Sequence, residues 1–272
     1  MEKTLKTMSS TFAKLHESGC FVIPNPWDVG SAKYLAGLGF KALATTSAGF
    51  AWSKGKADGD MSVDEVLFHI RDLVSVSTVP VNADFEDGFS DEIEQFAENI
   101  AKVVQTGVAG FSIEDSTKNG EAPLYEISVA VERIRRARSV IDQSGSGAFL
   151  TGRAEGFIRG RPDLADVIQR LQAYSKAGAD CLYAPGISKD EEVLAIVQAV
   201  APKPVNFVVR KPGLTVSDLA ALGVRRISVG GALARSVWGE LMRAAQEIAE
   251  QGTFERLGQG ASGAELNSLM AD

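Results

Sequence analysis

Three carboxylates gather in one short stretch of this 272-residue chain. A short apolar run ends at Val81, and Asp84, Glu86 and Asp87 follow before Gly88 breaks the chain. Mg²⁺ prefers oxygen ligands and is usually held by one or two carboxylates together with waters and substrate oxygens. A solvated acidic loop has the same composition. The stretch alone therefore predicts a metal site or an acidic loop, and the rest of the chain must decide between them.

Further polar and small residues follow the other predicted strands. They are Asn25 and Trp27, then Ser47, Ala48 and Gly49, then Glu114 and Asp115, then Arg153 and Glu155, and finally Asn206 and Arg210. An arginine can grip a carboxylate or phosphate with two hydrogen bonds, although an ion pair with Glu155 or Glu114 is the alternative for Arg153. Several carboxylates close together raise one another's pKa unless a cation lies among them. The set predicts Mg²⁺, with Mn²⁺ as the alternative, and an anionic substrate bridging the metal and Arg153.

Eight short apolar runs alternate with helical segments and must position these residues. The runs are 20–23, 42–44, 79–83, 109–113, 149–151, 181–184, 205–209 and 226–229. Short apolar strands without alternation are typical of parallel strands buried on both faces. At this length the rhythm predicts an α/β fold, a (β/α)₈ TIM barrel over residues 1–251, in which residues after each strand meet at one rim. A doubly wound open sheet is less favoured, because no G-x-G-x-x-G or Walker loop is present.

Local signals predict several element boundaries. Asp28 is expected to cap a helix over 29–38, and Ser62 with Glu65 is expected to form a capping box. Ser90 and Ser188 are expected to cap the next helices in the same way. We expect a leading helix at 8–18, a polar loop at 53–60, and a tail with one short helix at 252–272. This tail is assigned to the same domain or to an oligomer contact.

Composition excludes several classes of function. The formal net charge of −7 makes nucleic acid an unsuitable partner. No run reaches the length of a membrane span, and the first ten residues do not resemble a signal peptide. Two cysteines, Cys20 and Cys181, fit the reducing cytoplasm. The two histidines, His16 and His69, lie in helical stretches, which argues against a Ser-His-Asp triad or a zinc site.

The chain resembles the isocitrate lyase/phosphoenolpyruvate mutase superfamily over nearly its whole length, specifically its phosphoenolpyruvate phosphonomutase-like branch. The matching blocks are Pro-Asn-Pro-Trp-Asp at 24–28, Ala-Thr-Thr-Ser-Ala-Gly at 44–49, Asn-Ala-Asp at 82–84, Gly-Val-Ala-Gly-Phe-Ser-Ile-Glu-Asp at 107–115, Gly-Arg-Ala-Glu at 152–155 and Ala-Gly-Ala-Asp at 177–180. Members are Mg²⁺-dependent barrels that form or break C–C or P–C bonds next to a 2-oxo acid or its enolate. The resemblance implies a homo-oligomer, a dimer or tetramer, in which the eighth helix is exchanged between subunits.

The resemblance also implies roles for individual residues. The metal ligands would be Asp84, Glu114, Asn82 and Glu86. The substrate would be bound by Trp27, Ser47, Ala48, Gly49, Arg153 and Asn206. The catalytic residues would be Arg153, Asp58, Lys118 and Glu155.

Two departures from the family pattern bear on mechanism. Asn82 stands where the family usually has an aspartate, and we expect Glu86, one alternation further along the strand, to compensate for the lost charge. The loop after the fourth strand lacks the cysteine and histidine of the lyases, whereas Lys118 and Asn119 partly match the mutases. A mutase-like histidine after the sixth strand is replaced by Tyr183. The proton donor therefore stays open among Lys118, Glu121 and Tyr183.

These observations predict a lyase or decarboxylase that acts on a small 2-oxo or 2-hydroxy dicarboxylate through an enolate stabilised by a divalent metal. One alternative is a P–C bond enzyme, either a phosphoenolpyruvate mutase or a phosphonopyruvate hydrolase. A second alternative is a barrel that binds 2-oxo acids without catalysis. Arg225 and Arg226, which precede the eighth strand, are assigned to the stability face of the barrel.

Overall fold

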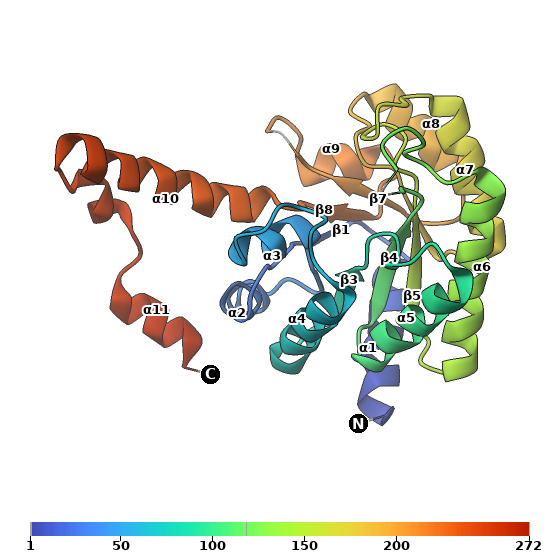
Figure 1. Cartoon of the computed structure of the whole chain (residues 1–272), viewed down its shortest axis with the longest axis horizontal. Coiled ribbons are helices and arrows are strands. Elements are labelled where there is room, and N and C mark those ends of the chain that lie inside the picture. The colour runs from blue at the N-terminus through green and yellow to red at the C-terminus, as the bar shows by residue number, and fades with distance from the viewer. Residues whose placement is uncertain (1, 118, 211, 272) are drawn as a thin grey trace.

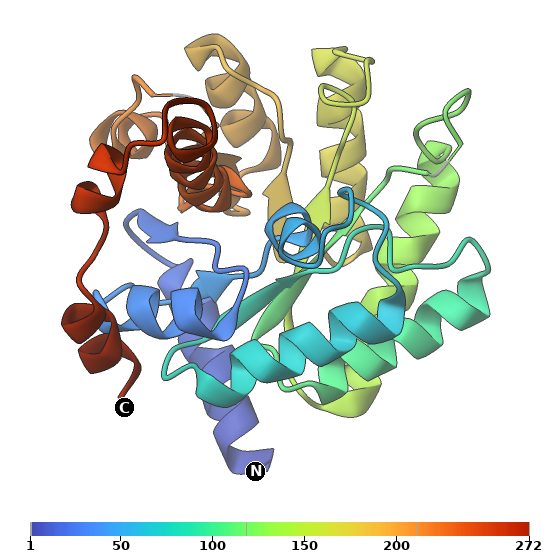
Figure 2. The ribbon, with the colours of Figure 1, turned by 60° about the vertical axis from the view of Figure 1, so that its left-hand side comes forward.

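Eight parallel strands form a nearly closed barrel with helices around it (Figures 1 and 2). The computed structural model describes residues 2–117, 119–210 and 212–271, with side chains from residue 7 onward. The strands are β1 Phe21–Ile23, β2 Leu43–Ala44, β3 Val81–Asp84, β4 Gly110–Glu114, β5 Phe149–Arg153, β6 Cys181–Tyr183, β7 Val205–Val208 and β8 Arg226–Ser228. Strands β2 to β7 each pair with the next strand in the chain, β8 pairs with β1, and β1 and β2 are the two ends of the sheet order. The predicted (β/α)₈ barrel is confirmed.

Helices alternate with these strands as predicted. Their bounds are α1 Glu2–Leu15, α2 Val29–Gly37, α3 Ser47–Ser53, α4 Val63–Val76, α5 Ile93–Gln105, α6 Ile127–Ser144, α7 Leu164–Ala177, α8 Asp190–Val200, α9 Val216–Ala221, α10 Ala232–Gln251 and α11 Gly263–Met270, with a 3₁₀ turn at Glu255–Gln259. The strands are short and buried because the barrel interior covers one face and the helices cover the other. All strands therefore point their C-terminal ends at the same rim.

Two of the four predicted helix caps are confirmed. The Asp28 side chain accepts from the Ser31 amide, and Ser62 forms the expected capping box with Glu65. Ser90 is not a cap, because its hydroxyl accepts from the Glu92 amide at 3.1 Å in a turn that precedes α5. A serine two residues before a helix serves such a turn as readily as it serves a cap.

The second incorrect cap is at α8. Its N-cap residue is Lys189 rather than Ser188, and the helix begins at Asp190. The carboxylate of Glu192 reaches back to accept from the Ser188 and Lys189 amides at 3.2 and 3.3 Å. An acidic side chain in the first turn therefore satisfies the two amides that immediately precede the helix.

One helix at the rim was not predicted. Helix α3 spans Ser47–Ser53, and the Thr46 hydroxyl caps it by accepting from the Gly49 amide at 3.3 Å. Gly49 is required there, because a Cβ atom would lie 2.9 Å from the Cβ of Trp27. Helix α3 follows β2 directly and forms part of the rim.

The first helix closes the bottom of the barrel. Helix α1 begins at Glu2 and ends at Leu15, earlier than the predicted span of 8–18. Phe12 is fully buried and belongs to one apolar cluster with Ile23 of β1 and with Ala109, which precedes β4. The polar barrel interior described below is thereby separated from solvent at this end.

Helix α10, which follows the last strand, does not pack along the barrel. Helix α10 leaves β8 and extends away from the barrel, and the chain then turns back so that α11 lies beside α2 (Figure 1). Only Ala234 and Glu247 are buried along α10. The tail meets the barrel again at α2, where Lys33 donates to the main-chain oxygen of Met270 at 3.3 Å. Across the described ranges, no helix is both long and apolar enough to cross a membrane.

Candidate active site

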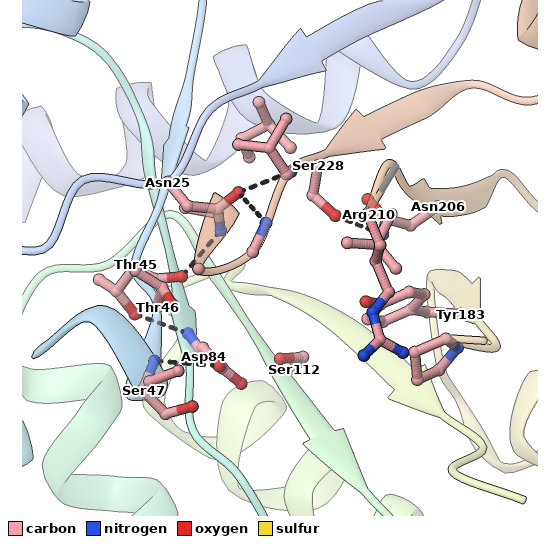
Figure 3. Close-up of a pocket in the computed structure, with 18 of the residues that line it drawn as sticks. Asn25, Thr45, Thr46, Ser47, Asp84, Ser112, Tyr183, Asn206, Arg210 and Ser228 are labelled. Carbon is pink, nitrogen blue, oxygen red and sulfur yellow. Dashed lines mark hydrogen bonds between the residues drawn. The ribbon is translucent and has the colours of Figure 1, made fainter. Parts of the chain in front are cut away.

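A cavity of about 350 Å³ lies at the C-terminal ends of the strands (Figure 3). Its walls come from all eight strands or the segments that follow them, including α3. Asn25, Thr45, Thr46, Ser47 and Asp84 form one side, and Tyr183 and Arg210 form the other (Figure 3). The cavity therefore occupies the rim where a barrel of this type places its active site.

Asp84 is fixed by neighbouring segments at the start of this wall. Its amide donates to the Thr45 hydroxyl at 2.8 Å, and its carboxylate accepts from the Ser47 amide at 3.2 Å. Asn25 holds the same wall from the other side by donating to the Thr45 main-chain oxygen at 3.0 Å. The carboxylate is thus oriented into the cavity by two backbone-linked contacts.

Arg153 contacts three carboxylates, which come from β3, from β4 and from the segment after β5. One terminal nitrogen lies 3.3 Å from Asp84 Oδ1 and 3.1 Å from Glu114 Oε2. Its Nε forms an ion pair with Glu155, which is fully buried. The guanidinium also lies over the Tyr183 ring, 5.2 Å from its centre. The predicted closeness of Arg153 and the acids is present, and so is the ion pairing that was the alternative for this arginine.

A second cavity of about 530 Å³ adjoins the first. Ser47, Asp58 and Arg153 line both cavities, whereas Glu86 and Glu114 line only the second. Arg153 therefore stands at the boundary, with Asp84 on one side and the remaining acids on the other. The two spaces form one acidic and arginine-containing region at the rim.

Arg159 is a second cation of this region that the sequence did not single out. Its terminal nitrogen lies 3.3 Å from Glu114 and 3.2 Å from the Ser116 hydroxyl. Arg159 lies in no recognisable motif. Only its position four residues after Glu155, the spacing of one helical turn, could have indicated that it belongs to the site.

Burial and mutual repulsion raise the pKa values of the acids. The pKa of Glu86 rises to about 8, first through burial and then through the charges of Asp84 and Glu114. Burial and Asp84 also raise the pKa of Asp58. For Glu114, burial raises the pKa and Arg153 opposes the rise. Without a divalent cation, the site therefore retains protons that isolated carboxyl groups would lose.

The predicted strand alternation at Glu86 is wrong. Strand β3 ends at Asp84, and Glu86 has a φ of +45°, which lies in the left-handed region. The side chain is therefore placed by a turn rather than by the pleat of the strand. Its Oε1 atom is buried without a hydrogen-bond partner among the described residues. It nevertheless borders the second cavity beside Glu114.

Arg153 and Tyr183 keep their protons across the neutral range. Burial acts to lower the pKa of Arg153, but Glu114 and Glu155 outweigh it and raise this pKa above its ordinary value. Burial raises the pKa of the Tyr183 hydroxyl. Complete burial also raises the pKa of Glu155, against the opposing effect of Arg153. The region thus offers a fixed cation and a protonated phenol next to each other.

The prediction that Arg226 lies on the stability face of the barrel is wrong, because Arg226 lies at the floor of the first cavity. This residue is the first of β8, but its side chain lies in the barrel interior and borders the cavity. Its Nε donates to Asn206 Oδ1 at 2.8 Å, and Asn206 in turn donates to the Ser228 hydroxyl at 3.0 Å. A long side chain can reach the interior from the base of a strand, which residue order alone does not reveal.

Most of the predicted site residues are brought together, and a few are not. The first cavity is bordered by Ser47, Ala48, Asp58, Asn82, Asp84, Arg153 and Asn206, and the second by Asp58, Glu86, Glu114, Arg153 and Glu155. Trp27 and Gly49 border neither cavity, and Trp52 of α3 borders the first instead. Glu121 is exposed, and Lys118 lies outside the described residues.

The acids offer oxygen ligands for a divalent cation without forming a complete cage. Within residues 2–117, 119–210 and 212–271, no group of three or more His, Cys, Asp or Glu side chains is arranged to hold a metal. Asn82 Oδ1 and Glu86 Oε1 are nevertheless buried oxygens without partners in that part of the chain. Mg²⁺ needs only one or two carboxylates, with waters and substrate completing its shell. Asp84, Glu114 and these two oxygens therefore fit such an ion.

Comparison with known proteins finds one matching family model and several relatives. The family model described as phosphoenolpyruvate phosphomutase matches residues 12–249. A candidate lyase/mutase of known structure from Burkholderia cenocepacia J2315 is 45% identical, with a TM-score of 0.96 over 98% of each chain. An uncharacterized protein from Mycobacterium tuberculosis is 35% identical over 81% of each chain. The 2,3-dimethylmalate lyase of Eubacterium barkeri is 26% identical over 79% of this chain and 78% of its own. The oxaloacetate decarboxylase of Rhodopseudomonas palustris is 26% identical over 78% and 70%.

Proposed function

Because the chain belongs to the phosphoenolpyruvate phosphomutase family, within the isocitrate lyase/phosphoenolpyruvate mutase superfamily, we propose that it is a Mg²⁺-dependent lyase or decarboxylase. Its substrate would be a small 2-oxo or 2-hydroxy dicarboxylate, cleaved through an enolate. The chain is an enzyme of the isocitrate lyase/phosphoenolpyruvate mutase type. The narrower proposal adds the metal and the substrate class.

One observation carries the proposal. A single nitrogen of Arg153 lies within 3.3 Å of both Asp84 and Glu114 at the boundary of two cavities. The acids can hold a cation, and the arginine can hold an anion at the same place. A 2-oxo acid presents a carboxylate and a ketone oxygen side by side, which suits such a pair of opposite charges.

Asp84 and Glu114 would hold the metal, with Asn82 and Glu86 as the adjoining oxygen donors. When bound, Mg²⁺ would supply electrostatic stabilisation of the negative charge that develops on the ketone oxygen. Losing one such contact typically lowers a rate by about 10²–10³. Mn²⁺ offers the same preference for oxygen ligands and is the alternative ion.

The other residues would bind the substrate and transfer a proton to it. Arg153 would bind a carboxylate of the substrate, and the segment that begins at Ser47 would approach it with main-chain N–H groups. In a decarboxylation the C3–C4 bond breaks and the terminal carboxylate leaves as CO₂ without a proton. The electron pair of the broken bond forms the enolate. A proton must then add to C3. Tyr183 is favoured as its source over Glu121, because it borders the cavity and burial keeps the phenol protonated.

The relatives support this substrate class. Two matched proteins are named 2,3-dimethylmalate lyase and oxaloacetate decarboxylase, and both names refer to dicarboxylates. The rim also supplies several arginines, so an acidic protein with net charge −7 still presents cations to an anionic ligand. The free cysteines Cys20 and Cys181 suit the cytoplasm, where we place the protein.

A second candidate is P–C bond chemistry on a phosphonate. The matching family is described as phosphoenolpyruvate phosphomutase, and Asn119 borders the second cavity where the resemblance places a mutase-type loop. Tyr183 in place of the family's histidine opposes it. Phosphorus NMR of phosphonopyruvate incubated with the protein and Mg²⁺ would separate the two candidates, since an unchanged spectrum rules out P–C cleavage.

We also propose that the protein is a homo-oligomer, a dimer or tetramer, that exchanges α10 between subunits. Val237, Leu241 and Met242 of this helix are 56%, 53% and 57% exposed. A helix with several exposed large apolar side chains is expected to bury them against another surface. A second copy of the chain supplies such a surface, and exchange of α10 would bring it beside the rim of that copy.

The experiment that tests the function is a turnover assay. Purified protein is incubated with Mg²⁺ or with EDTA and a panel that contains oxaloacetate, malate and 2,3-dimethylmalate, and products are followed by proton NMR. We expect pyruvate, or the corresponding 2-oxo product, only with Mg²⁺ and above the spontaneous rate. If no member of the panel is consumed by the Mg²⁺-loaded protein, the proposed function is refuted.

A further inference from the structure

Arg226 carries a buried charge that no carboxylate of the described residues neutralises. Its side chain is 3% exposed, and within the described residues it forms no ion pair. Removing a charged group from water costs several kcal/mol unless a partner compensates it. An arginine of this kind therefore lacks a counter-ion in the isolated chain.

Its direct partners are neutral hydrogen-bond acceptors from three other elements. Nε donates to Asn206 at 2.8 Å, one terminal nitrogen donates to Thr151 at 3.0 Å, and the other faces His16 Nε2 at 3.4 Å. His16 donates from Nδ1 to the Phe12 main-chain oxygen, so its Nε2 is an acceptor. Burial and the charge of Arg226 lower the pKa of His16 to about 3, which keeps the ring neutral. These contacts fix the guanidinium in place without cancelling its charge.

The other buried arginines are compensated differently. Arg153 and Arg170 each form ion pairs with carboxylates. Arg133 lies over the rings of Phe96 and Tyr125, 4.2 and 4.6 Å from their centres. In the part of the chain that the structure describes, Arg226 has neither kind of partner, but it borders a cavity. The cavity is therefore the place from which compensation can come.

The charges around this cavity also favour an additional anion. Four arginines border it, namely Arg153, Arg210, Arg226 and Arg235, against two aspartates, Asp58 and Asp84. Arg153 already contacts carboxylates of the protein. Arg226 does not, and its distance from solvent strengthens any hydrogen bond that it makes to an anion.

We propose that Arg226 is the second anion-binding residue of the cavity, and that it binds the distal carboxylate of a diacid whose 2-oxo or 2-hydroxy acid end lies at Arg153 and Asp84. The inference rests on the proposed function and deepens it, because it explains why a dicarboxylate rather than a monocarboxylate would be selected. Asn206 and Ser228 complete this floor. With its oxygen held by Arg226, the Asn206 amide group donates to the Ser228 hydroxyl, which leaves that hydroxyl's proton available for the ligand.

Calorimetry with a matched pair of acids tests the proposal. Lactate and malate share a 2-hydroxy acid end, and malate adds one carboxylate. We expect wild-type protein with Mg²⁺ to bind malate at least about tenfold more tightly than lactate, the scale of one charge-assisted contact. Arg226→Gln should lower malate affinity by about ten- to a hundredfold and leave lactate affinity within about twofold.

Arg225→Gln is the matched control. It removes the same charge one residue away, where Arg225 donates to the Gly19 main-chain oxygen outside the cavity. We expect its affinities to equal those of the wild type. If Arg226→Gln weakens both acids equally, or neither, Arg226 does not bind the distal carboxylate and the inference is wrong.

Two further outcomes separate this inference from the proposed function. Wild-type protein that binds lactate and malate equally well would overturn the inference and leave the proposed function standing, whereas a wild-type protein that binds neither would overturn both. If Arg226→Gln does not fold, crystals of the wild type soaked with malate and Mg²⁺ decide. A malate carboxylate within hydrogen-bonding distance of Arg226 is expected, and a distal carboxylate directed elsewhere overturns the inference.

Discussion

Replacing Glu86 by glutamine should stabilise the metal-free protein at alkaline pH. The pKa of Glu86 is raised from 4.5 to about 8 by burial and by neighbouring acids, so the folded state keeps a proton that the unfolded chain releases. A raised pKa contributes stability that is fully present below pH 4.5 and is lost as the pH rises to about 8. Glutamine has nearly the same shape and cannot ionise. It therefore keeps that contribution at every pH.

The size of the effect follows from the shift. Each unit of pKa difference corresponds to about 1.4 kcal/mol, so the span from 4.5 to about 8 gives an upper figure of about 5 kcal/mol. Glu86 is only partly enclosed, and water near it reduces the figure to about 3–5 kcal/mol. The strained backbone does not enter the comparison, because both residues must adopt the same φ of +45°.

Urea unfolding in EDTA between pH 5 and 9 measures the difference. We expect the wild type to lose free energy of unfolding across this range relative to Glu86→Gln, and the variant to be more stable at pH 9. Glu121→Gln, at an exposed position, should follow the wild type. If the two Glu86 proteins give parallel curves, Glu86 is ionised in the folded state at neutral pH, and the described repulsion among the acids is wrong.

Three other changes test separate features. Gly88→Ala should cost about 3 kcal/mol or more of unfolding free energy, because Gly88 has a φ of +81° and a Cβ there would overlap the ring of Phe96; Gly145→Ala, with φ +63° and open space, should cost only about 1 kcal/mol, and equal losses in thermal unfolding would contradict the crowding. Asp84→Asn should lower Mg²⁺-dependent turnover of oxaloacetate by about 10²–10³ while circular dichroism stays unchanged, and full activity would remove Asp84 from the site. Leu241→Glu should reduce the mass measured by light scattering, and an unchanged mass would exclude an oligomer interface at this part of α10.

The fold and most of the rim could be predicted because both depend on local pattern. Short apolar runs separated by helical segments define the eight strands, and the residues after each strand are carried to one edge. Asp84, Glu114 and Arg153 meet for this reason alone. The caps at Asp28 and Ser62 were also predictable, because a side-chain acceptor and the helix that it caps lie within three residues of each other.

The parts that could not be predicted depend on longer reach or on unusual backbone. Glu86 leaves the strand through a left-handed conformation that its residue type does not indicate. Arg226 crosses the barrel interior to Thr151, so its position in the sequence says little about where its charge lies. Helix α3 has only seven residues and contains a glycine, too few and too mixed for a periodic pattern. Its only local signal is the Thr46 cap.

Asn25 has a consequence for how the barrel opens. The sheet order begins at β1 and ends at β2, and there the main-chain link is the hydrogen bond from the Ala44 amide to the Pro24 oxygen at 3.0 Å. The prolines on either side of Asn25 have no N–H to donate. The Asn25 side chain substitutes for the missing ladder by bonding to the Thr45 oxygen on one side and to the Val229 and Gly230 amides on the other.

A seam held by one main-chain hydrogen bond and one amide side chain is expected to be the least cooperative edge of the barrel. Local breathing should begin there, and hydrogen–deuterium exchange should be faster at the Ala44 amide than at the Phe111 amide in the fully paired strand β4. Because Thr45 and Asn25 both border the cavity, we expect local opening of this seam to widen the rim of the cavity.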